Sequence, residues 1–177
     1  MKKDFSKIKL FAMDVDGTLT DGKIYIGNDG EVMKAFNAKD GLGIKLLIKK
    51  GIVPIIITGR RSKIVTRRCE EIGITVLYQG VRDKADILKN VMAKYDCTPE
   101  QTVYIGDDMN DLSAMQTAGI TFAPADCAAA LLPYVDFVLT QKSGDAPVRE
   151  AIDIILENRL TLSDYERKAS DFLDSFG

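Results

Sequence analysis

Short apolar runs alternate along this chain with longer segments whose apolar residues recur at helical spacing. Strands are predicted at 8–13, 53–58, 75–78, 102–106, 120–123 and 137–139. Helices are predicted at 41–50, 62–72, 84–95, 110–118 and 146–158, with a weaker short helix at 127–132. This order is typical of a mostly parallel sheet covered by helices, so the chain is expected to fold as an α/β protein.

One segment, at 23–36, breaks this alternation. Its apolar residues lie on both sides of Asn28, Asp29 and Gly30, and Asn and Gly tolerate the positive φ of tight hairpin turns. The segment is therefore predicted to form a small β-hairpin. The last segment, at 161–177, is polar with scattered apolar residues and is predicted to be a solvated helical tail. Docking of this tail on a neighbouring subunit is the alternative.

Length and composition bound the class of protein. A chain of 177 residues suits one domain, so a single domain over 1–177 is expected. The 24 basic and 26 acidic residues nearly cancel, so neither nucleic acid nor an anionic membrane is an expected partner. No apolar run approaches the roughly 18 residues that span a bilayer, and the charged first residues do not resemble a signal peptide.

The cysteine and histidine content narrows the chemistry. Cys69, Cys97 and Cys127 are widely spaced and odd in number, which argues against a disulfide framework or a zinc site and for a cytoplasmic location. The chain contains no histidine, which excludes triads of the serine–histidine type and metal sites built on imidazole. Carboxylate and Mg²⁺ chemistry stays possible.

Two acidic residues, Asp14 and Asp16, follow the first predicted strand. Carboxylates two positions apart at the end of a strand can both reach one pocket. One can attack a phosphorus atom while the other exchanges a proton with the leaving or entering oxygen. A pair of turn carboxylates is the alternative when this motif is taken alone. A calcium loop is disfavoured, because Leu19 and Tyr25 stand where such a loop needs Gly and Glu.

Two further motifs offer groups that bind phosphate. Thr58 and Gly59 follow the second predicted strand, and a hydroxyl and a backbone amide there could hold phosphate oxygens. Lys84 opens a helix and could neutralise phosphate and nucleophile together, although taken alone it is better explained as an exposed lysine on a first helical turn. Ligands of an open parallel sheet collect at the carboxyl ends of its strands. Asp14, Thr58 and Asp107 each follow a predicted strand, so they are expected to converge at one edge of the sheet.

A second acidic motif follows the strand at 102–106. It contains Asp107, Asp108 and Asp111, whose carboxylates repel one another unless a cation lies among them. Helix capping explains one of these acids but not all three. A hard cation such as Mg²⁺ is the natural candidate. Together, the four motifs predict a phosphatase.

With these motifs, over 8–111, the chain resembles the phosphatases of the haloacid dehalogenase superfamily. The resemblance implies a Rossmann-like three-layer α/β/α core and a phosphoaspartate intermediate. It implies Asp14 as nucleophile and Asp16 as general acid/base. Thr58 is implied as a phosphate ligand and Lys84 as the residue that stabilises charge. It also implies Mg²⁺ held by Asp14, the backbone carbonyl of Asp16, and Asp107, with Asp108 and Asp111 supporting these ligands. Relatives that cleave carbon–halogen or phosphonate bonds lack the acid at position 16, so ester hydrolysis is favoured.

The spacing of the motifs leaves no room for a cap domain. Asp14 and Thr58 are 44 residues apart, and Thr58 and Lys84 are 26 apart, and the predicted elements fill both intervals. A phosphatase without a cap must take a large substrate or close its site with a neighbouring subunit. The hairpin at 23–36 is the element available for such an interface.

A narrower resemblance, to the 3-deoxy-D-manno-octulosonate 8-phosphate phosphatases, covers roughly 8–150 and is carried by segments 21–22, 36–44, 57–62, 77–80 and 148–150. It implies a homotetramer with active sites at subunit boundaries and a small anionic sugar-acid phosphate as substrate. The implied substrate-binding residues are Asp16, Asn37, Ala38, Lys39, Asp40, Gly41, Lys45, Gly59, Arg60, Arg68 and Lys84. Cationic side chains among them suit a substrate with a carboxylate and a phosphate.

Some features depart from this family or favour other functions. The family's glycine-rich segment before the last helix is replaced at 143–150, and a histidine often found near Ala128 is absent. A phosphatase for a nine-carbon sialic-type sugar acid is the alternative enzyme, but such relatives carry Glu at the position of Arg60. A receiver-like phosphoacceptor domain is the alternative outside enzymes. It would carry its phosphorylated Asp after the third strand, where Tyr78 and Gln79 stand instead.

Overall fold

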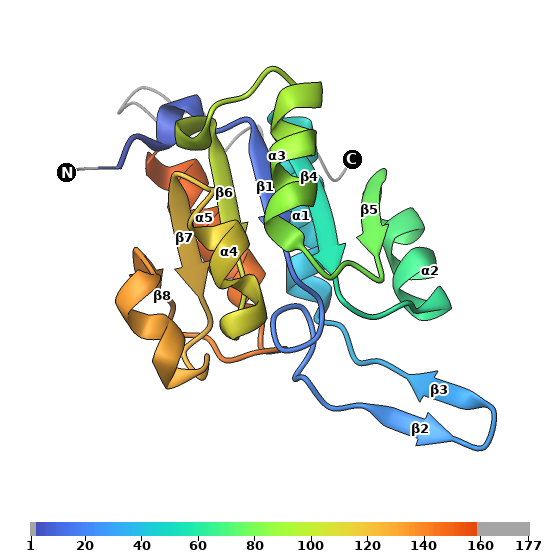
Figure 1. Ribbon diagram of the computed structural model, residues 1–177. Helices are drawn as coiled ribbons and strands as arrows, with labels where there is room; N and C mark the ends of the chain where they lie inside the picture. The colour runs from blue at the N-terminus through green and yellow to red at the C-terminus, as the bar shows by residue number, and fades with distance from the viewer. Residues whose placement is uncertain (1–2, 159–177) are drawn as a thin grey trace.

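The computed structural model describes residues 3–158, which build a six-stranded parallel sheet with helices on both faces (Figure 1). The strands are β1 (Leu10–Met13), β4 (Val53–Thr58), β5 (Val76–Gln79), β6 (Thr102–Ile105), β7 (Ile120–Ala123) and β8 (Phe137–Val138). Their order across the sheet is β5-β4-β1-β6-β7-β8. All pairs are parallel, and Leu10 of β1 lies opposite Val53 of β4 and Thr102 of β6. The predicted strands and the α/β class are confirmed.

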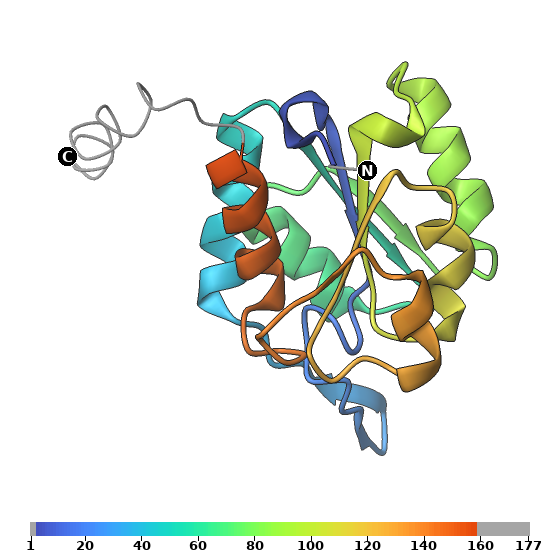
Figure 2. The ribbon, with the colours of Figure 1, turned by 90° about the vertical axis from the view of Figure 1, so that its left-hand side faces the viewer.

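The helices form the two outer layers (Figure 2). They are α1 (Ala38–Lys49), α2 (Lys63–Ile72), α3 (Lys84–Lys94), α4 (Leu112–Met115) and α5 (Pro147–Asn158). Helices α1, α2 and α5 pack on one face of the sheet, where they meet Phe11 and Met13. Helices α3 and α4 pack on the other face, where they meet Leu10 and Ala12. Residues of β1 thus alternate between two apolar cores, which is why buried parallel strands read as continuous apolar runs.

Three predicted helices differ from the structure. The short helix predicted at 127–132 is a 3₁₀ helix (Ala129–Tyr134) that contains Pro133. Helix α1 begins at Ala38 rather than 41, because the Asn37 side chain accepts a hydrogen bond from the Lys39 amide and caps the helix. The segment predicted as one helix at 110–118 is a 3₁₀ turn (Met109–Asp111) followed by the short α4. The chain leaves the helix before Gly119, whose amide donates to the carbonyl of Pro99. The predicted helical tail at 161–177 lies outside the described residues.

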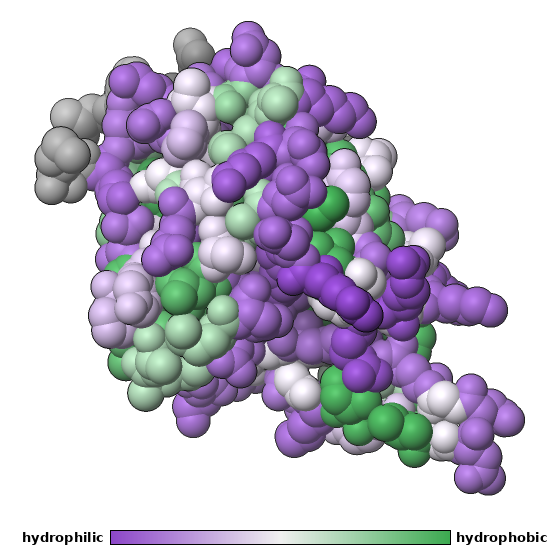
Figure 3. Space-filling model, viewed as in Figure 1, coloured by the Kyte–Doolittle hydropathy of each residue, from purple (hydrophilic) through white to green (hydrophobic). Residues whose placement is uncertain are grey.

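The hairpin predicted at 23–36 is confirmed and projects from the body of the protein (Figure 1). Its strands are β2 (Tyr25–Gly27) and β3 (Gly30–Met33), which pair antiparallel. Ile26 is 71% exposed and Val32 is 61% exposed. Figure 3 shows apolar side chains gathered on this projection. Such surface on an isolated ribbon is unusual for a monomer.

None of the helices within residues 3–158 combines the length and the apolar character needed to cross a lipid bilayer.

Candidate active site

Three neighbouring strands deliver the predicted catalytic motifs to one edge of the sheet. Asp14 follows β1, Thr58 ends β4 and Asp107 follows β6, and β4 and β6 flank β1 on either side. Oxygen atoms of Asp14, Asp107 and Asp111 lie within 4.8 Å of one another. The convergence expected from parallel strands is therefore observed.

Lys84 lies at the base of this cluster as the first residue of α3. Its Nζ is 3.0 Å from Asp14 Oδ2 and 2.6 Å from Asp111 Oδ1, and its side chain is buried. Burial acts to lower the pKa of Lys84, but the charges of Asp14 and Asp111 outweigh burial and raise it. Lys84 therefore stays a fixed positive charge against Asp14, and the alternative of an exposed lysine is wrong.

Asp111 is fully buried, and both of its carboxylate oxygens are engaged. Oδ1 accepts hydrogen bonds from Lys84 and from the hydroxyl of Tyr104 at 2.7 Å. Oδ2 accepts from the backbone amides of Asp107 at 3.1 Å and of Asp108 at 3.4 Å. Asp111 thus braces the loop that carries Asp107. The Asp108 side chain is exposed and caps the 3₁₀ turn through the Met109 amide at 2.7 Å.

Asp107 packs against the turn that follows β1. Its Oδ1 accepts a hydrogen bond from Thr18 Oγ1 at 3.1 Å. The other oxygen lies against Gly17, where the Cβ of any larger residue would overlap the carboxylate. Gly17 also has a φ of +89°, which glycine adopts without strain. Glycine at position 17 therefore allows both the positive φ of the turn and the close contact of the Asp107 carboxylate with this turn.

The acidic cluster carries more negative charge than its one lysine offsets. Burial, and then the charge of Asp111, raise the pKa of Asp14 to about 6. The same two causes raise the pKa of Asp107 to about 7. Asp14 Oδ1 is buried and has no hydrogen-bond partner among residues 3–158. An unpartnered carboxylate oxygen beside a second carboxylate is a suitable site for a hard cation.

Asp16 is half-buried and contacts two cationic side chains. Lys34, which follows β3, forms an ion pair with Asp16 Oδ1. Arg60 Nε lies 3.8 Å from Asp16 Oδ2, and the Arg60 side chain is 48% exposed. Sequence reasoning missed Lys34, because its partner depends on how the hairpin folds back. It also missed Tyr104, although a tyrosine inside a buried strand needs a partner for its hydroxyl.

Apart from Asp16 and Lys84, the predicted substrate residues lie on or just before α1, on α2 and directly after β4. Asn37 Nδ2 donates to the carbonyl of Gly144 at 3.2 Å, and Asp40 Oδ1 accepts from the Arg149 amide at 2.7 Å. Burial raises the pKa of Asp40 to about 6. The Arg68 guanidinium lies 5.8 Å from the ring centroid of Phe36.

The other predicted substrate residues are mostly accessible. Two of these other residues are buried: Gly41 beside the Arg68 guanidinium and Thr58 at the end of β4. The exposed ones are Ala38, Lys39, Lys45 and Gly59. The acidic cluster thus gathers Asp14, Asp107, Asp111 and Lys84. Away from this cluster, Asn37 contacts the loop before α5, Asp40 contacts α5, and Arg68 of α2 lies against Phe36.

Comparison with known proteins relates this chain to one family of hydrolases. The haloacid dehalogenase-like hydrolase family matches residues 73–152. The 3-deoxy-D-manno-octulosonate 8-phosphate phosphatase KdsC of Yersinia pestis is 46% identical over 151 residues, which are 85% of this chain and 81% of the relative. The KdsC protein of Escherichia coli K12 is 43% identical over 84% of this chain and 79% of its own length.

A solved structure extends this likeness to three dimensions. It is a 3-deoxy-D-manno-octulosonate 8-phosphate phosphatase from Moraxella catarrhalis in complex with a magnesium ion, a phosphate ion and a KDO molecule. The two structures superpose with a TM-score of 0.87 at 36% identity, over 98% of this chain and 96% of the other.

Proposed function

Because the chain belongs to the 3-deoxy-D-manno-octulosonate 8-phosphate phosphatase family of haloacid dehalogenase-like hydrolases, we propose that it hydrolyses the phosphate ester of 3-deoxy-D-manno-octulosonate 8-phosphate. The products are the free eight-carbon sugar acid, a lipopolysaccharide precursor, and inorganic phosphate. The observation that carries the proposal is the buried Asp14 carboxylate, which Lys84 holds at the edge where Asp107 also lies.

The proposed reaction has two steps. An oxygen of Asp14 attacks phosphorus, the bond between phosphorus and the sugar oxygen breaks, and Asp16 gives its proton to that oxygen. A water molecule then attacks the phosphoaspartate, Asp16 takes a proton from this water, and Asp14 leaves as a carboxylate. Lys84 offsets the negative charge of Asp14 and of the transferring phosphoryl group, because its ammonium is held 3.0 Å from Asp14.

The residues of the cluster fit a Mg²⁺ ion. We assign Asp14, Asp107 and the backbone carbonyl of Asp16 as its ligands, with Asp108 and Asp111 in support. The unpartnered Asp14 Oδ1 and the raised pKa of Asp107 favour this assignment, and the four hydrogen bonds on Asp111 explain its supporting role. Bound Mg²⁺ supplies positive charge to phosphoryl oxygens and orients the phosphate for attack.

Substrate recognition is assigned to residues around this cluster. We assign the phosphate to Thr58, which ends β4 beside β1, and to Gly59, which follows it. Arg60 is half-exposed next to Asp16 and suits the carboxylate of a sugar acid. We assign binding of the sugar to the start of α1, to Lys45 and to Arg68. Arg60 also favours the eight-carbon acid over the nine-carbon one.

We further propose that the chain is a single domain over 1–177 and acts as a cytoplasmic homotetramer. The apolar, exposed hairpin supports subunit packing, because a second subunit would bury Ile26 and Val32. The free cysteines Cys69, Cys97 and Cys127 suit a reducing compartment.

Release of inorganic phosphate from a panel of substrates tests the proposed function. With Mg²⁺ present, 3-deoxy-D-manno-octulosonate 8-phosphate should be hydrolysed far faster than a nine-carbon sugar-acid phosphate, glucose 6-phosphate or a nucleotide. Asp14→Asn should abolish turnover while the protein stays folded, because an amide is a poor nucleophile. Undiminished turnover by this variant, or by the wild-type enzyme in excess chelator, would contradict the mechanism.

A further inference from the structure

A buried lysine connects the hairpin to the residue assigned as general acid. The Lys34 side chain is only 2% exposed, and its ammonium pairs with Asp16 Oδ1 and lies 3.1 Å from Glu31 Oε1. Burying an ammonium group is costly unless its partners are well placed. Two carboxylates, one from the turn after β1 and one from β3, therefore fix the position of Lys34.

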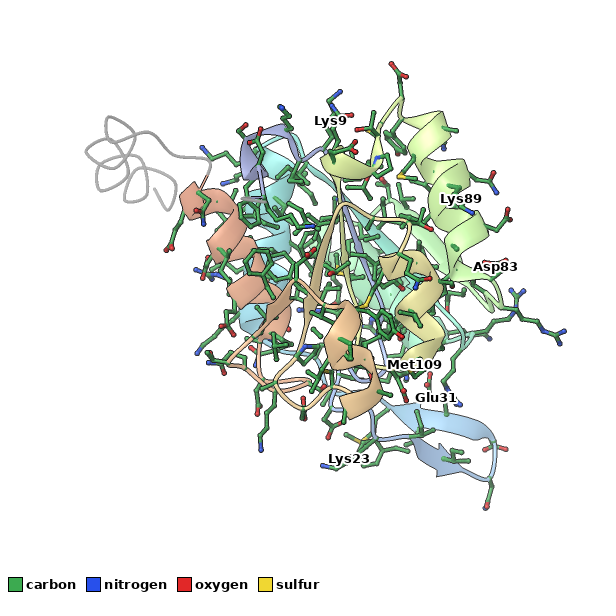
Figure 4. All side chains as sticks on the ribbon, turned by 60° about the vertical axis from the view of Figure 1, so that its left-hand side comes forward. Lys9, Lys23, Glu31, Asp83, Lys89 and Met109 are labelled. Carbon is green, nitrogen blue, oxygen red and sulfur yellow. The ribbon has the colours of Figure 1, made fainter. Side chains whose placement is uncertain are left out.

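Glu31 in turn is tied to the body of the protein. Glu31 Oε2 accepts a hydrogen bond from the hydroxyl of Ser62, which also caps α2 by accepting from the Val65 amide at 3.3 Å. The Ser62 amide donates to Gln79 Oε1 at 2.6 Å, so the link reaches the end of β5. Figure 4 shows Glu31 on the side of the hairpin that faces the rest of the protein. Lys34 is thus held by ion pairs with Asp16 and Glu31, and hydrogen bonds tie Glu31 to the start of α2 and the end of β5.

We propose that Lys34 is a positioning residue, which holds the Asp16 carboxyl group where it can give a proton to the departing sugar oxygen. Arg60 cannot replace it in this role, because the Arg60 side chain is half-exposed and its Nε is 3.8 Å from Asp16. Glu31 holds Lys34, and through this pair the hairpin orients the reacting carboxyl group. The inference rests on the proposed phosphatase function.

The dependence of kcat/KM on the leaving group tests this role. An alkyl or sugar phosphate needs a proton on its departing oxygen, whereas p-nitrophenolate departs from p-nitrophenyl phosphate without one. Lys34→Met should lower kcat/KM for the sugar-acid phosphate by roughly tenfold to a hundredfold. It should change kcat/KM for p-nitrophenyl phosphate by less than about threefold, because only proton transfer depends on the orientation of Asp16.

Matched variants keep the test independent of folding. Lys34→Arg, which retains the charge, should recover part of the lost kcat/KM for the sugar-acid phosphate. Lys89→Met removes an exposed lysine of α3 (Figure 4) and should leave both substrates unaffected. Glu31→Gln should give the same selective loss as Lys34→Met, but a smaller one. If thermal unfolding shows that Lys34→Met does not fold, the comparison of the two substrates is made with Glu31→Gln instead.

An equal loss on both substrates, or no loss on either, would overturn the positioning role of Lys34. These results are distinct from failure of the proposed function, in which the wild-type protein itself would not release phosphate in the presence of Mg²⁺.

Discussion

Replacing Gly17 with alanine tests whether the placement of Asp107 governs metal binding. A Cβ at position 17 would overlap the Asp107 carboxylate, and the φ of +89° is strained for alanine. The backbone strain alone should cost roughly 1–2 kcal/mol of the free energy of unfolding. The overlap has a separate consequence, since the Asp107 carboxylate must leave its present position, the one assigned to it for binding Mg²⁺.

Gly51 provides the matched control. Its φ is +74°, but a Cβ there would meet no atom of the described residues within 4 Å. Gly51→Ala should therefore lose about the same 1–2 kcal/mol of the free energy of unfolding as Gly17→Ala loses to strain. Its affinity for Mg²⁺ and its kcat should match the wild type, because Gly51 follows α1 at the far end from the acidic cluster. Comparing the variants separates backbone strain from displacement of Asp107.

Displacing Asp107 should weaken Mg²⁺ binding by roughly tenfold to a hundredfold. This corresponds to about 1.4–2.7 kcal/mol of binding free energy. Isothermal titration calorimetry measures the Kd for Mg²⁺, and urea denaturation without Mg²⁺ measures the free energy of unfolding. If Gly17→Ala bound Mg²⁺ with wild-type affinity while losing only the stability that Gly51→Ala loses, the assignment of Asp107 as a ligand would be refuted.

Two further predictions concern the substrate and the assembly. Arg60→Ala should raise KM for the sugar-acid phosphate roughly tenfold or more with a smaller effect on kcat, because one charge-assisted contact is lost; steady-state kinetics that showed an unchanged KM would exclude that contact. Light scattering at micromolar concentration should give about four times the chain mass of 19.5 kDa, and Ile26→Asp should reduce it. A fully active wild-type monomer would show that the hairpin is not needed to close the site.

The acidic residues that meet at the sheet edge were predictable because a local pattern specifies them. A short apolar run ending in an acid fixes both the strand and the edge at which the acid emerges, as it does for Asp14 after β1 and Asp107 after β6. Helix α1 was less predictable. Its first turn is polar, and its start depends on the Asn37 cap rather than on apolar spacing.

The partners of each acid could not be read from local patterns, because residues distant in sequence supply them. Asp111 and Asp107 look alike in the sequence. Of these two acids, however, it is Asp111 that accepts hydrogen bonds from Lys84, 27 residues away, and from the hydroxyl of Tyr104. The difference between a bracing acid and an acid free to bind a cation therefore arises from tertiary packing. The same holds for Asp16, whose ion pair with Lys34 requires the hairpin to fold back on the turn after β1. The sequence thus indicates which groups reach the site, and the packing around them determines the role that each can take.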